Sequence, residues 1–148
     1  MDGVSSVITS MPTFSGPFFF GMDEMHLIAR GIGSQVYHTI KEDGHAKYGG
    51  TLEYPFEFVA GYGMADVAKY MELSKATIPE CFEGCFDGCF GTYRAIDWED
   101  FLATVVPCIA LQYIASNLAK IKLMDLINAC NISMARELRA SDLILISE

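Results

Sequence analysis

Apolar residues recur at intervals of three and four along several stretches of the chain, which is the spacing that lines one face of an α-helix. The first stretch covers residues 23–40, with Asp23 placed to cap its N-terminus. It contains Gly31 and Gly33, and because glycine weakens a helix interior, these positions indicate close packing or a break. A second helix is predicted over residues 64–74, because Pro79 prevents any longer continuation.

The second half of the chain is denser in apolar residues. Residues 96–109 form a broad apolar surface and predict the core helix, which Pro107 should kink or divide. Two further helices are expected, one over residues 118–130 and one from about Ser133. The apolar tail 143–146 then ends abruptly, which indicates a longer ancestral chain or a binding partner for the tail.

The remaining segments have the composition of loops. Residues 1–20 show no sustained period and are predicted to be irregular, while residues 41–56 read as a solvated loop with a short extended piece at 51–54. Another loop runs through about Tyr93. The sequence therefore predicts a mainly α fold, in which a single helical domain of four to six helices over residues 21–148 follows the irregular segment 1–20.

Composition and charge narrow the function classes. With 51% hydrophobic and 20% charged residues, the chain has the composition of a globular protein. Its net charge of −9 opposes free-standing binding to nucleic acid, which depends on lysine and arginine. The first twenty residues contain Asp2 but no basic residue, and the odd count of five cysteines fits reduced thiols. These features favour an intracellular protein.

Residues 101–119 lack any charge, and this uncharged length is close to that of a membrane span. The same segment contains Pro107, Gln112 and Asn117, which are easier to accommodate in a soluble core than in lipid. A membrane span is therefore disfavoured.

Two acidic clusters are candidates for chemistry. Asp23 and Glu24 carry carboxylates, the hard ligands that suit a divalent metal, and the imidazole of His26 could join or orient them. At most two of the three converge on a helix, and an acidic helix start with an ordinary histidine is the alternative. Asp97, with Glu99 and Asp100, precedes the core helix, where negative charge stabilises the N-terminus; the functional alternative makes one of them a metal ligand.

The cysteines at positions 81, 85 and 89 form a near-repeat with phenylalanines. Successive gaps of three residues without a nearby histidine do not match zinc or iron–sulfur spacing. Cys81, Cys85 and Cys89 are therefore interpreted as part of a loop with buried phenylalanines.

Five strings of the sequence belong together: Phe19-Phe20-Gly21-Met22-Asp23-Glu24-Met25-His26-Leu27-Ile28-Ala29-Arg30-Gly31-Ile32-Gly33, Thr77-Ile78-Pro79, Phe82-Glu83-Gly84, Tyr93-Arg94-Ala95-Ile96-Asp97-Trp98 and Asp100-Phe101-Leu102. They resemble transposon-derived proteins common in early-diverging fungi, which look related to the CACTA (En/Spm-like) transposases. The similarity extends from about Thr13 to Asp142 and is most specific over residues 21–33 and 94–102.

The resemblance implies a fragment of an RNase H-like transposase, whose acidic residues hold two metal ions for phosphodiester transfer. Asp23 and His26 match an Asp-x-x-His string of that superfamily, which implies structural or site-supporting roles for them. The first two catalytic acids have no counterpart upstream, and Asp97 or Glu137 could stand where a third acid would be. Catalysis is thus expected to be incomplete.

The main expectation is a transposase-derived helical domain without independent catalysis or a cofactor, nuclear if that descent holds and otherwise cytoplasmic. A domesticated interaction module is the first alternative, binding a partner or a second copy through the apolar face 101–113 or the tail 143–146. The second alternative is a residual nuclease dependent on Mg²⁺ or Mn²⁺, with Asp23 and His26 as candidate metal ligands.

Overall fold

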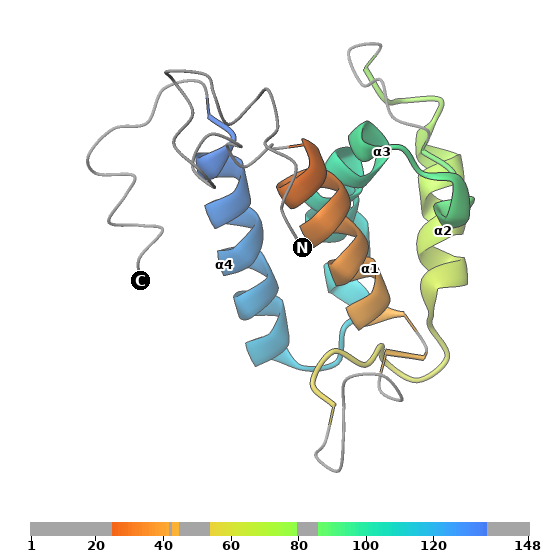
Figure 1. The fold of residues 1–148 in the computed structure, drawn as a ribbon. Helices are drawn as coiled ribbons and strands as arrows, with labels where there is room; N and C mark the ends of the chain where they lie inside the picture. Colours follow the sequence, from red (N-terminus) through yellow and green to blue (C-terminus); the bar gives the residue numbers. More distant parts are fainter. Residues whose placement is uncertain (1–24, 42, 45–53, 80–85, 136–148) are drawn as a thin grey trace, which may run out of the picture.

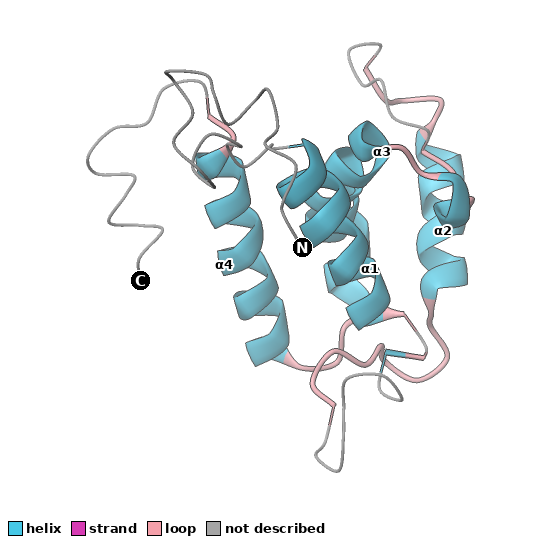
Figure 2. Cartoon of the chain, in the orientation of Figure 1, coloured by secondary structure: helices cyan, strands magenta, loops and turns pink. Residues whose placement is uncertain are grey.

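The computed structural model describes residues 25–41, 43–44, 54–79 and 86–135. Within these residues the fold is mainly helical, as predicted, and Figure 2 shows helices joined by loops. The elements in order are η3 (Met25–Gly33), α1 (Ser34–Ile40), α2 (Met64–Ser74), η5 (Phe90–Thr92), α3 (Ala95–Asp100), η6 (Phe101–Ala110), η7 (Leu111–Tyr113) and α4 (Asn117–Ser133).

The first helix begins as the π-helical η3 and continues as α1, so the glycines do not break it. Gly33 lies directly against the backbone of α3: a Cβ at this position would stand 2.6 Å from the carbonyl oxygen of Trp98. Close packing is therefore the correct interpretation of Gly33. The expected cap, Asp23, lies outside the described residues.

The core helix widens at Pro107 instead of dividing. Residues 95–113 form α3, η6 and η7 in succession, with Pro107 inside the π-helical η6. Proline has no N–H and its ring collides with the carbonyl four residues earlier, so a wider turn relieves the clash. At the end of η6, the N–H of Leu111 donates to the carbonyl oxygen of Val106, five residues earlier.

The apolar side chains of residues 101–113 form the centre of the core. The fully buried ones are Phe101, Leu102, Val105, Val106 and Ala110. Helices α2 and α4 and segment η3 of the same chain pack around η6. The expectation that 101–113 offers an apolar face to a partner is therefore corrected: its own chain covers that face.

Aromatic rings connect the elements on one side of the core. The Tyr37 ring of α1 stacks on Phe90 at 4.6 Å between ring centroids, and both approach Phe101. Trp98 meets Tyr93 edge to face at 4.9 Å. These pairs join α1, η5, α3 and η6 through contacts that favour offset or edge-to-face geometry.

Helix α4 lies at one edge of the molecule, as Figure 1 shows. Ser116 caps it by accepting a hydrogen bond from the N–H of Ala119 at 3.3 Å. Helix α4 continues to Ser133, and the further helix expected from about Ser133 lies almost entirely outside the described residues, which end at Ala135. The tail 143–146 lies outside the described residues.

Near the start of α4 the chain forms an isolated antiparallel bridge between Phe58 and Ile114. The sequence instead placed an extended piece at 51–54, of which the structure describes only Tyr54. None of the helices in the described part of the chain combines the length and apolar character that crossing a membrane requires.

Candidate functional site

Helix α4 is apolar on two sides. Its inner side, which packs on the core, consists of Ala119, Leu123, Ile127 and Cys130, all of them buried. These positions repeat at intervals of three and four, as expected for one helical stripe. The apolar residues that remain on α4 are not needed for this contact.

We define the outer face of α4 as Leu118, Ile121, Lys122, Asp125 and Ala129. At about 3.6 residues per turn these positions form one continuous strip that points away from the inner side. Leu118 and Ile121 are 65% and 56% exposed. Between them and Ala129, the Nζ of Lys122 pairs with Oδ2 of Asp125 at 3.0 Å. The outer face therefore combines exposed apolar area with one cation and one anion.

An apolar groove of about 600 Å³ separates α4 from η3 and α1. Val36 and Leu123 are buried at its base, while Leu27 and Leu126 are 41% and 37% exposed at its rim. The other described lining residues are Gly31, Ile32, Gln35, Thr39 and Phe56. The volume of the groove and its mostly apolar lining are both typical of ligand-binding pockets.

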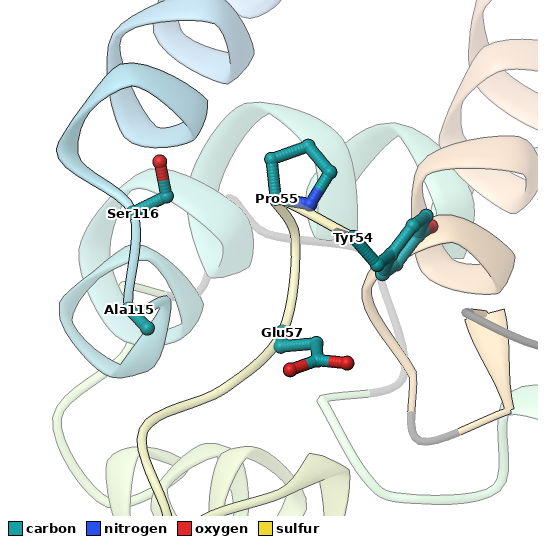
Figure 3. Close-up of a pocket in the computed structure, with 5 residues that line it drawn as sticks. All are labelled: Tyr54, Pro55, Glu57, Ala115 and Ser116. Atoms are coloured by element: carbon teal, nitrogen blue, oxygen red, sulfur yellow. The ribbon is translucent and has the colours of Figure 1, made fainter. Parts of the chain in front are cut away.

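A second, more polar pocket of about 370 Å³ lies beside the bridge between Phe58 and Ile114 (Figure 3). Its described lining residues are Tyr54, Pro55, Glu57, Ala115 and Ser116. The Tyr54 hydroxyl donates a hydrogen bond to the carbonyl oxygen of Thr39. The backbone N–H of Ala115 donates to the backbone carbonyl oxygen of Glu57 at 2.8 Å.

The polar pocket provides little chemistry. Its described lining includes one carboxylate, that of Glu57, whereas acid–base catalysis commonly uses a pair of groups with different pKa values. The Ser116 hydroxyl already caps α4. This pocket is therefore explained by the way the chain joins η7 to α4.

Asp97 is buried, with 3% of its surface exposed. Its carboxylate accepts hydrogen bonds from the backbone N–H of Arg94 at 2.7 Å and from the Arg94 side chain at 3.1 and 3.2 Å. The backbone bond belongs to a capping arrangement at the start of α3. The geometry thus gives Asp97 a structural role at the N-terminus of α3.

The other residues proposed for a metal site are not gathered in the described structure. Asp23, Glu24 and Glu137 lie outside the described residues, while His26 is exposed near the start of η3. Over residues 25–41, 43–44, 54–79 and 86–135, no three His, Cys, Asp or Glu side chains group as metal ligands.

Of the three cysteines interpreted as a loop, only Cys89 belongs to the described residues. It is exposed and does not form a disulfide, whereas Cys81 and Cys85 fall in the part that is not described. Its neighbour Phe90 is buried in the core. This agrees with a loop that is anchored by a phenylalanine.

Three tyrosines stack where α2 meets η7. The Tyr113 ring lies between Tyr62, at 4.7 Å, and Tyr70, at 6.0 Å. Desolvation by burial, followed by the hydrogen bond with Tyr70, raises the pKa of Tyr113 to about 12. The stack thus joins Tyr70 of α2 to Tyr113 of η7.

The sequence reading missed the outer face of α4 as a candidate surface. A usable signal was present, since residues 118–130 contain more apolar positions than a single buried stripe requires. The groove could not be predicted from the sequence, because it depends on the distance between α4 and α1.

Comparisons with known proteins returned no match among protein-family models, curated proteins or solved structures.

Proposed function

We propose that this chain is a non-catalytic helical interaction domain that binds a second copy of itself through the outer face of α4. The observation that carries the proposal is the exposure of Leu118 and Ile121 on the side of α4 opposite its buried stripe. Exposed apolar residues grouped on one face of a helix are typical of protein contact sites.

The balance of charges on the outer face favours a second copy as its occupant, although the net charge of the chain does not. Two copies with a net charge of −9 repel one another over most of their surface. The outer face is an exception, because Lys122 balances Asp125 and leaves it neutral. A twofold contact also requires a surface that complements itself, and one cation beside one anion meets that requirement.

The oligomeric state of the full chain tests the proposal. Light scattering coupled to size-exclusion chromatography should show a concentration-dependent change from monomer to dimer, with a dissociation constant in the micromolar range typical of small interfaces. Ile121→Glu should give a monomer, because it places a charge in the apolar contact.

The matched control is Asn131→Glu, which adds the same charge at an exposed position of α4 away from the outer face. It should dimerise like the parent chain. A parent chain that stays monomeric at the highest soluble concentration would refute self-association.

Descent from a transposase-like protein is a second part of the proposal and rests on the resemblance over residues 21–33 and 94–102. The described portions of these segments pack together, with Gly33 against the backbone of Trp98, so both belong to one structural unit. In this proposal neither Asp23, His26 nor Asp97 catalyses a reaction, and Asp97 caps α3.

Plasmid nicking in the presence of Mg²⁺ or Mn²⁺ tests the absence of catalysis, and no nicking is expected. Metal-dependent nicking by the parent chain that disappears in His26→Ala would instead establish a residual nuclease. Circular dichroism of that variant would confirm that it remains folded.

A further inference from the structure

We infer that α4 pairs with α4 of the second copy in antiparallel orientation. The twofold axis crosses the outer face at the level midway between residues 123 and 124 along the helix. This inference rests on the self-association proposed above and specifies its register. Helix α4 has 17 residues, so the paired helices would run beside one another for about 25 Å.

The apolar residues of the outer face fit this register. In an antiparallel pair centred between positions 123 and 124, Leu118 lies at the level of Ala129 of the second copy. A large side chain then faces a small one, which allows two helices to approach closely. Ile121 lies nearer the axis, and its two copies stand at equal distances on opposite sides of it, which adds apolar area near the centre of the contact.

The charges of the outer face give stronger evidence for the register. Lys122 and Asp125 are equally distant from the proposed axis, so each lysine lies level with the aspartate of the other copy. Within one chain they already pair at 3.0 Å, and both side chains are more than half exposed. Dimerisation would therefore bring two such pairs into one alternating group of four charges. A parallel pair would instead place like charges at the same level.

Charge reversal tests this register directly. In the homodimer of Lys122→Glu, the new carboxylate lies level with Asp125 of the other copy. In the homodimer of Asp125→Lys, the new ammonium group lies level with Lys122 of the other copy. Each single variant should dimerise roughly ten-fold or more weakly than the parent chain, since like charges repel at close range.

A mixture of the two single variants should form heterodimers, which native mass spectrometry can resolve because the variants differ in mass. In the heterodimer every introduced charge faces an opposite one across the interface, although the pair within each chain is broken. A purely intramolecular role for Lys122 and Asp125 predicts no such rescue.

The double variant Lys122→Glu/Asp125→Lys keeps the test decisive if a single variant fails to fold. It restores opposite charges both within and between chains, and it should dimerise like the parent. Asn131→Glu mixed with the parent chain gives the reference amount of heterodimer that forms when two chains with intact outer faces exchange freely.

The outcomes separate the two proposals. A parent chain that remains monomeric overturns self-association and the register with it. If the parent chain dimerises, two results overturn the antiparallel register but leave self-association standing. The single variants dimerise as well as the parent, or their mixture forms no heterodimer.

Discussion

Gly33 shows how one residue can fix the position of two helices. Its backbone approaches the carbonyl of Trp98 so closely that a side chain would overlap backbone atoms, which cannot rotate away as a flexible side chain can. The contact joins η3 to α3, although about sixty residues separate them along the chain.

Gly33→Ala should therefore destabilise the fold by about 1–3 kcal/mol, the usual range for overpacking a core. Urea denaturation of the variant and the parent measures the difference. Gly91→Ala is the control, because a Cβ at Gly91 meets no atom within 4 Å. Equal losses in the two variants would show that the contact with Trp98 is unimportant.

Asp97→Asn should destabilise the fold by about 1–3 kcal/mol, because a buried amide would replace a carboxylate that accepts three hydrogen bonds from Arg94. Most of this loss should come from burying the amide NH2 group beside the N–H donors of Arg94, since the Arg94 side chain is largely exposed and its attraction to the carboxylate is screened by water. Glu72→Gln, at an exposed ion pair, should change thermal stability little. A stable Asp97→Asn protein would contradict the structural role.

At the scale of elements, Ser116 determines where α4 begins. Ser116→Ala removes the oxygen that accepts the N–H of Ala119, and it should cost about 1 kcal/mol of stability. Ser133→Ala is a suitable control, because the exposed Ser133 hydroxyl only donates to a carbonyl within the same helix. Denaturant titration would count against the cap if both serine variants had the same stability.

The sequence predicted elements with one apolar face better than elements that are apolar all round. Helix 64–74 was predicted with its observed limits, because its apolar side is clear and Pro79 follows. In 101–113, by contrast, nearly every position is apolar, so the pattern could not distinguish a buried core from a surface offered to a partner.

The candidate surface was harder to predict than the fold. Which side of α4 is outer depends on the position of η6, and that position depends on contacts such as Gly33 with Trp98. The bridge between Phe58 and Ile114 was missed for a related reason: one residue on each side leaves no alternating pattern. The sequence left Asp97 as a candidate metal ligand, because its hydrogen bonds with Arg94 are evident only from the structure.

At the scale of the whole molecule, net charge opposes the proposed dimer. Two chains with a charge of −9 repel one another at long range, whereas Lys122 and Asp125 would attract at contact. Salt screens charges farther apart than about 8–10 Å most strongly. Raising ionic strength from roughly 0.01 M to 0.15 M should therefore tighten dimerisation, as measured by sedimentation velocity. Weaker dimerisation over this range would argue that attraction between charges dominates.

The groove between α4 and α1 also affects how the molecule opens. Because the groove separates these helices and α4 packs chiefly on η6, α4 can detach while the contact between η3 and α3 persists. Amide hydrogens of α4 should then exchange with solvent faster than those of α3, as expected for a separate cooperative unit. If α4 also forms the dimer contact, its exchange alone should slow as protein concentration rises. Hydrogen exchange would thus show in one experiment whether α4 opens independently and whether dimerisation suppresses that opening.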